Sequence, residues 1–138
     1  MSQRDPASEL NVESIRALWE GWTPGDEMDM SILDPDVVFE DANLPDHIGE
    51  PYRGHEGVAR ATERWLEPYE SVTVQLERIV GRGDRLVSIH HARSKARYTG
   101  IEDEGPLAYV WTFRDGKVIH LRSYRDPSDA LEAVGLRE

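Results

Sequence analysis

The sequence predicts an α+β fold, with helices gathered in the first half of the chain and antiparallel strands running through the second half. Before residue 70, apolar side chains recur at the spacing of a helix. After residue 70, strand-like stretches follow one another, and Asp115-Gly116 between two of them is a strong signal for a tight hairpin. Helices that precede consecutive strands favour α+β over an alternating α/β arrangement, and such helices must pack on one face of the sheet.

A first helix is predicted over residues 11–22, because Val12 and Ile15 begin a run of apolar residues at helical spacing. Pro24 and Gly25 end it, since neither residue readily continues a helix. Two further helices are expected before the main run of strands, at residues 26–34 and 55–69.

Five strands are predicted between clusters of turn residues, at 37–41, 71–80, 85–98, 107–114 and 117–125. A long loop over residues 42–54, which contains His47, is expected to act as a lid. A last helical turn over 127–134 ends at Gly135, a residue typical of helix ends.

The composition narrows the class of protein. The chain has 138 residues, which fits a flexible N-terminus over 1–10 and one domain over 11–138. The net charge of -11 argues against nucleic acid and anionic membrane as partners, because both require a basic face. The lack of cysteine excludes disulfides, thiolate metal sites and cysteine nucleophiles. No signal peptide, metal motif or cofactor motif is visible, so we expect a cytoplasmic protein without metal or cofactor.

Four stretches of the sequence occur in an order and at spacings found together in one superfamily: residues 22–26, 34–41, 52–58 and 113–118. On these stretches the chain resembles the SnoaL-like group of the nuclear transport factor two and steroid delta-isomerase superfamily, over residues 11–136. The resemblance implies a cone-shaped α+β barrel, in which a strongly curved, mostly antiparallel sheet wraps on three helices of the N-terminal half and encloses a pocket. It also implies a homodimer packed through the outer face of the sheet. It does not imply one reaction, because the group includes isomerases, cyclases, epoxide hydrolases and proteins with no known chemistry.

Strand alternation gives this pocket a predicted lining. Side chains two residues apart share a face of a strand, and a slip of one residue would reverse the assignment. Each predicted pocket face is apolar with a few polar groups, as expected for a small-molecule site. On the long strand over 85–98, the predicted pocket face is the one that carries Val87 and Ile89. The expected lining comprises Trp19, Phe39, Asp41, His91, Arg93, Tyr109, Trp111, Leu121 and Ser123.

Asp41, His91 and Tyr109 are the candidate catalytic residues. The resemblance places Asp41 at the general base of the steroid isomerases, and a carboxylate beside aromatic walls is suited to proton transfer. Asp41 is equally suited to capping the turn that follows it. His91 is a candidate proton carrier or hydrogen-bond donor, or else a histidine of the dimer face. Arg93 is a candidate ligand-binding residue, or else one half of a cross-strand ion pair.

The chain departs from the catalytic patterns of both enzyme groups that it resembles. Arg93 and Ser123 fall where the epoxide hydrolases carry catalytic carboxylates. Leu18 falls on the oxyanion tyrosine of the steroid isomerases, and Tyr109 falls on their protonated aspartate. Epoxide hydrolysis is therefore not expected, although a tyrosine hydroxyl can still donate to an oxyanion.

Two functions remain open at this level. The first is a cofactor-independent isomerase or cyclase that uses acid–base chemistry on an apolar carbonyl compound, with Asp41 as base and His91 or Tyr109 at the oxyanion. The second is a non-catalytic module for ligand binding or dimerisation. The enzyme hypothesis requires Asp41, His91 and Tyr109 to converge on one cavity.

Overall fold

The structure, a computed structural model, describes residues 6–41 and 51–136. Its elements in chain order are α1 (Pro6–Glu20), β1 (Leu33–Asp41), β2 (Tyr52–Arg53), α2 (Gly54–Leu66), β3 (Tyr69–Arg82), β4 (Arg85–Ala96), β5 (Glu102–Arg114), β6 (Lys117–Tyr124) and α3 (Pro127–Ala133). The predicted lid falls mostly on residues 42–50, so that part of the prediction, with His47, lies outside the described residues.

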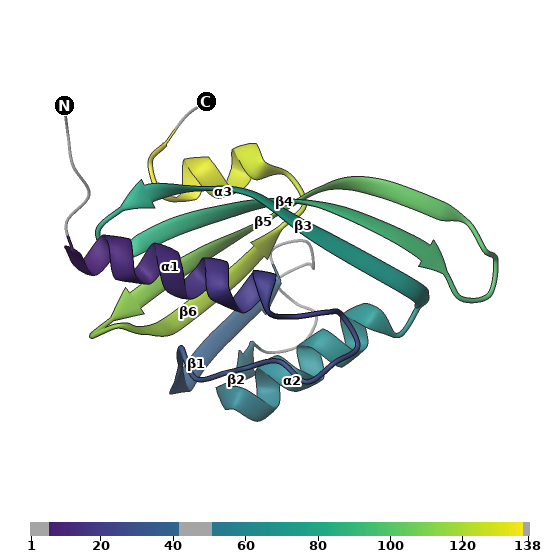
Figure 1. Cartoon of the computed structure of the whole chain (residues 1–138), viewed down its shortest axis with the longest axis horizontal. Coiled ribbons are helices and arrows are strands. Elements are labelled where there is room, and N and C mark those ends of the chain that lie inside the picture. Colours follow the sequence, from purple (N-terminus) through teal and green to yellow (C-terminus); the bar gives the residue numbers. More distant parts are fainter. Residues whose placement is uncertain (1–5, 42–50, 137–138) are drawn as a thin grey trace.

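The strands form one curved sheet in the order β2-β1-β6-β5-β4-β3. Every neighbouring pair is antiparallel except β1 and β6, which run parallel. Helix α1 lies across one face of the sheet, α2 lies beside β1 and β2 at one end of the sheet, and α3 packs behind it (Figure 1). The predicted α+β class with a mostly antiparallel, curved sheet is thus confirmed.

The segment between α1 and β1 is not the short helix predicted over residues 26–34. It contains turns, with the amide of Asp26 donating to the carbonyl of Thr23 and the Asp29 carboxylate accepting from the amide of Ser31. Such side-chain bonds compete with helix formation. The segment then extends to reach β6, where the amide of Val118 donates to the carbonyl of Ile32. The third helix of the fold is therefore α3 at the C-terminal end, and not a helix of the N-terminal half.

The sheet is covered on both faces, which gives two apolar cores. The inner core lies under α1, where Ile15 and Leu18 pack in one cluster with Leu86 and Trp111 of the sheet. The outer core lies under α3 and contains Val87, Ile89, Ala108, Val110, Ala130 and Leu131. Strand β4 is sandwiched between the two, so its residues 86–90 are buried without interruption.

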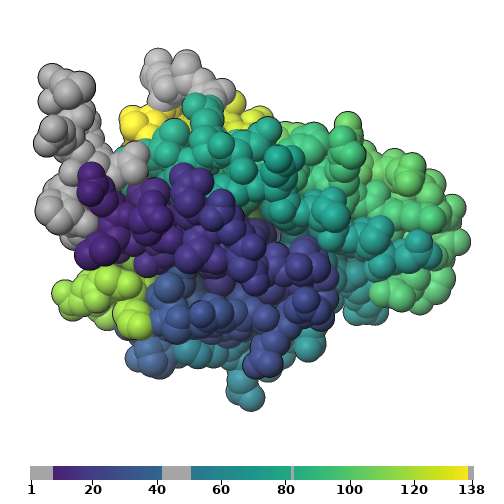
Figure 2. Space-filling view, viewed as in Figure 1, coloured from purple at the N-terminus to yellow at the C-terminus, as the bar shows by residue number. Residues whose placement is uncertain are grey.

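The hairpins are formed as expected. Asp115 and Gly116 both have positive φ angles, of 52° and 80°, as a two-residue turn of the primed type requires. The β4–β5 hairpin extends beyond the helices and stands clear at one end of the molecule (Figure 2). Within the described residues, no helix is both long and apolar enough to cross a membrane.

The β3–β4 turn provides a test of the fold. Gly81 has φ of 111°, and a Cβ there would lie 2.8 Å from the carbonyl oxygen of Arg85, whereas Gly83 has φ of 72° and open space around it. We expect Gly81→Ala to lower the free energy of unfolding by at least about 2 kcal/mol, and Gly83→Ala by about 1 kcal/mol. Urea denaturation of both variants checks this, and equal losses would contradict the geometry of the turn.

Candidate functional site

A cavity of about 610 Å³ lies between the inner face of the sheet and helices α1 and α2. Its walls are mostly apolar and aromatic, and include Leu18, Trp19, Phe39, Trp65, Leu107 and Trp111. Helix α1 supplies one wall because its apolar face must be buried against the sheet. Polar side chains interrupt this lining at a small number of places, and those places define the candidate site.

Three polar side chains form a row across neighbouring strands on the inner face. Asp41 of β1 pairs in register with Ser123 of β6, and Ser123 pairs with Tyr109 of β5. All three line the cavity. Because strands lie about 4.8 Å apart, Asp41 and Tyr109 are separated by roughly 10 Å of backbone spacing, with Ser123 between them.

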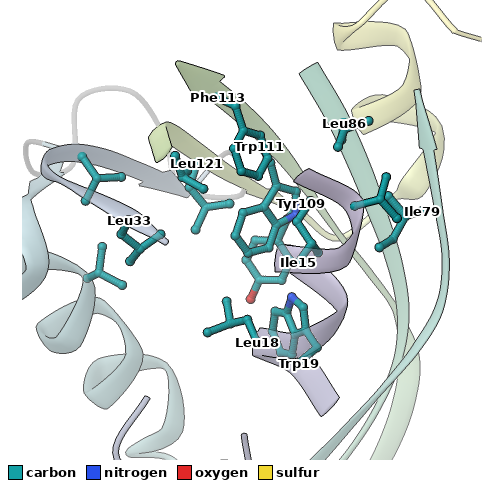
Figure 3. Packing of buried hydrophobic residues seen from close by; sticks show 14 of the residues in the cluster. Ile15, Leu18, Trp19, Leu33, Ile79, Leu86, Tyr109, Trp111, Phe113 and Leu121 are labelled. Carbon is teal, nitrogen blue, oxygen red and sulfur yellow. The ribbon is translucent and has the colours of Figure 1, made fainter. Parts of the chain in front are cut away.

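Hydrogen bonding distinguishes the two ends of this row. The hydroxyl of Ser123 donates to Oδ1 of Asp41 over 3.2 Å, and Asp41 is half-buried. Within the described part of the chain, the Tyr109 hydroxyl has no hydrogen-bond partner, although the residue is only 8% exposed. Figure 3 shows this hydroxyl pointing away from Phe113 and toward Leu18. The phenol is therefore free to donate to a bound molecule.

The Tyr109 phenol stays protonated across the physiological range. Burial, and then the negative charge of Asp41, raise its pKa above the ordinary value of 10.0. Asp41 and Tyr109 line the same cavity, so the charge of one acts on the other. A protonated phenol and a carboxylate thus face the same apolar cavity, one as a donor and the other as an acceptor.

The structure places most of the predicted lining at the cavity. Trp19, Phe39, Asp41, Tyr109, Trp111, Leu121 and Ser123 all line it. The prediction was wrong for His91 and Arg93, which lie on the other face of β4. Both contact Oε2 of Glu104 there, His91 through Nε2 at 3.4 Å and Arg93 through Nε at 2.8 Å. The cross-strand pair considered for Arg93 is the arrangement observed.

The error has a physical cause in the burial of β4. Alternation was read from Val87 and Ile89, whose apolar side chains were assigned to the pocket. They belong instead to the outer core under α3. The inner face of β4 carries Leu86, Ser88 and His90. The predicted inner face is therefore wrong by one residue. Because β4 is buried on both faces, its more apolar face need not be the one that meets the cavity.

Ser88 and His90 form a second polar layer behind the cavity wall, which the sequence analysis missed. The indole Nε1 of Trp111 donates to Oγ of Ser88 over 2.7 Å, and Nε2 of His90 lies 2.8 Å from the same oxygen. His90 packs against the rings of Trp19 and Tyr109, with centroid separations of 4.4 and 5.6 Å. Ser88 pairs in register with Tyr109 and so continues the polar row into β4. The available sequence signal was that Ser88 and His90 alternate with the apolar residues Val87 and Ile89.

His90 is a neutral histidine at physiological pH. Burial lowers its pKa from 6.5 to about 3. In the described residues, its Nδ1 and the Nε1 of Trp19 are buried without a hydrogen-bond partner. Such atoms cost about 1–3 kcal/mol each. Because the imidazole stays uncharged, it supports the aromatic wall through packing and through its contact with Ser88.

Tyr52 and Arg64 also belong to the cavity wall. Tyr52 falls within the predicted lid over residues 42–54, and Arg64 is not among the residues that the sequence predicts for the site. Nη1 of Arg64 donates to the Tyr52 hydroxyl over 2.8 Å, and the Tyr52 ring lies 6.2 Å from that of Phe39.

No group of three or more His, Cys, Asp or Glu side chains suited to a metal occurs in the ranges that the structure describes.

Comparison with known proteins identifies the family. The sequence profile of the SnoaL-like domain matches residues 15–121, so this chain belongs to the SnoaL-like domain family. The match begins inside α1 and extends through the strands of the sheet to Leu121 of β6. No curated protein matches the sequence.

Several solved structures share the fold. A putative SnoaL-like polyketide cyclase from Jannaschia sp. CCS1 is similar over 100% of both chains, at 20% identity and a TM-score of 0.78. TerC, co-crystallised with polyporic acid, is 22% identical with a TM-score of 0.71, over 91% of this chain and 97% of its own. A protein with a ketosteroid isomerase-like fold from Catenulispora acidiphila, in complex with trimethylamine, is 20% identical with a TM-score of 0.64, over 91% and 92%. These likenesses establish the fold, and the expected homodimer stays a prediction.

The neutral His90 gives a pH test of the second polar layer. Its pKa is lower in the folded state, so below pH 6.5 the unfolded state binds the proton first, and stability falls as the pH is lowered toward about 3. We expect the unfolding free energy of the native protein to drop by about 1–2 kcal/mol more than that of His90→Phe between pH 6.5 and 5. Urea denaturation at the two pH values measures the difference. An unchanged slope in His90→Phe would refute the assignment.

Proposed function

We propose that the cavity binds an apolar, ring-containing small molecule that carries a carbonyl group. The row of Asp41, Ser123 and Tyr109 beside the aromatic and apolar walls of the cavity is the observation that carries this proposal. The volume of about 610 Å³ is in the range of small-molecule sites, which is roughly 300–1,000 Å³. Aromatic walls favour a ring system, and the free phenol of Tyr109 favours a hydrogen-bond acceptor on it.

The solved relatives support binding of small molecules in this fold. One is described in complex with trimethylamine and another was co-crystallised with polyporic acid. Neither ligand is carried over to this chain, because identities near 20% leave the cavity walls free to differ. The relatives support small-molecule binding as the class of function. The identity of the ligand must be inferred from the walls of this cavity.

Binding can be tested with an uncharged apolar dye, N-phenyl-1-naphthylamine. We expect its fluorescence to rise on binding, and we expect Leu107→Trp to weaken that binding about tenfold, because Leu107 lines the cavity and the larger side chain fills it. Gln75→Trp places the same side chain on an exposed position of β3 and should leave binding unchanged. Equal affinities for both variants would show that the dye binds elsewhere.

We further propose that Asp41 and Tyr109 transfer a proton on the bound carbonyl compound. The Asp41 carboxylate takes a proton from the carbon next to the carbonyl, and the electron pair moves onto the carbonyl oxygen. The Tyr109 hydroxyl donates a hydrogen bond to the enolate oxygen that forms. Return of the proton to another carbon gives an isomer. Attack of the enolate carbon on a second carbonyl forms a ring, and the new alkoxide then takes the proton.

His91 has no part in this chemistry. The enzyme hypothesis required Asp41, His91 and Tyr109 to converge, and only Asp41 and Tyr109 line the cavity. The enzyme hypothesis in that form therefore fails, and the catalytic proposal made here is a new one that uses only Asp41 and Tyr109. The non-catalytic alternative is favoured by one observation, the bond from Ser123 to Asp41, since a carboxylate held this way also serves as a fixed acceptor for a ligand.

Exchange of carbon-bound hydrogen separates the catalytic proposal from the non-catalytic one. We expect the native protein to accelerate deuterium uptake at the carbons beside the carbonyl of 2-tetralone in D₂O, followed by NMR. Asp41→Asn should remove the acceleration, and Tyr109→Phe should reduce it about 100-fold, while both variants still bind the uncharged dye. Acceleration that survives in Asp41→Asn would exclude Asp41 as the base. Dye binding without any acceleration by the native protein would favour the binding module.

A further inference from the structure

Arg64 is a cation on the cavity wall that has no anionic partner in the described residues. It lies in the last turn of α2 and is exposed. Its one recorded contact is the hydrogen bond from Nη1 to the Tyr52 hydroxyl, at 2.8 Å. A guanidinium carries five N–H donors in a planar fork, so most of its donors remain available.

Tyr52 strengthens this donor group. Its hydroxyl oxygen accepts from Arg64, so its own hydrogen can be donated to a further group. The Tyr52 ring is held against Phe39, with which it is also paired in register between β2 and β1. Two donors, one charged and one neutral, are thus presented side by side on a wall that is otherwise apolar.

The charge around the cavity differs from that of the chain as a whole. The chain carries 27 acidic against 16 basic residues. The cavity lining carries Arg64 and Arg125 against Asp41, Asp103 and Glu104, and Glu104 is already paired to Arg93 outside it. The remaining charges are close to balanced, so the general repulsion of anions by this acidic protein is reduced at the cavity.

We propose that Arg64 and Tyr52 bind an anionic group of the ligand, so that the ligand class is an apolar ring compound carrying a carboxylate or sulfonate. The planar fork of arginine suits two oxygens of one anionic group. The rings of the ligand then lie along the aromatic wall toward Tyr109. This inference rests on the proposed small-molecule function and adds the charge of the ligand to it.

A matched pair of dyes tests the inference. The dye 8-anilinonaphthalene-1-sulfonate has the same ring system as N-phenyl-1-naphthylamine with one added sulfonate. We expect Arg64→Gln to lower the affinity for the sulfonate dye about five- to tenfold. The affinity for the uncharged dye should stay within about twofold of the native value. Arg60→Gln, one helical turn earlier and outside the cavity lining, is the control and should change neither affinity.

The salt dependence of dye binding is a second measurement. A purely structural role for Arg64 would not change it. Raising NaCl from 20 to 500 mM should lower the affinity of the native protein for the sulfonate dye by a larger factor than it lowers the affinity of Arg64→Gln, because salt screens an exposed ionic contact. Tyr52→Phe should lower the affinity for the sulfonate dye by a smaller factor than Arg64→Gln does, since it removes only the neutral donor.

The outcomes distinguish this inference from the proposed function. An unchanged affinity for the sulfonate dye in Arg64→Gln would overturn the inference while the cavity function stands. An equal loss for both dyes would also overturn it, because Arg64 would then only support the wall. If the native protein bound neither dye, or if Leu107→Trp affected neither, the cavity function and this inference would fall together.

Discussion

The parallel pairing of β1 with β6 is the constraint on which the candidate site depends. Some eighty residues separate the two strands in sequence, yet their register sets Asp41 beside Ser123, and Ser123 beside Tyr109 on the next strand. If β1 slipped by one residue, Asp41 would turn to the outer face and Glu40 would replace it. Glu40 is instead held on that outer face by His120, whose Nε2 lies 2.6 Å from its carboxylate. The outer pair and the inner row thus support the same register.

The cavity wall also depends on β4, which separates the two cores. On the inner side, Ser88 links Trp111 to His90 and supports the aromatic wall of the cavity. On the outer side, Val87 and Ile89 bind the sheet to α3. This arrangement gives the cavity a rigid floor, because both faces of the strand are held by packing. Rigid walls around a few free polar groups are what a specific small-molecule site requires.

The site combines features that favour ligand binding more directly than any one reaction. The free Tyr109 phenol, the Asp41 carboxylate and the Arg64 guanidinium offer a donor, an acceptor and a positive charge around an apolar space. Proton transfer needs only the first two, whereas recognition of an acidic ring compound needs the third. The fold by itself does not choose between a catalytic and a non-catalytic role, so the reacting groups must be tested directly.

The sequence by itself determined the class of fold, the hairpins and part of the cavity wall. Asp41, Tyr109, Trp111, Leu121 and Ser123 were found because each lies on a strand whose inner face was assigned correctly from its neighbours. The tertiary structure alone decided the rest. Residues 26–34 became an extended connection because β6 offers a hydrogen-bond partner that no local propensity reveals. His90 lies at the inner face in place of His91 because α3 covers the apolar side of β4, and a strand buried on both faces need not turn its apolar side to the cavity.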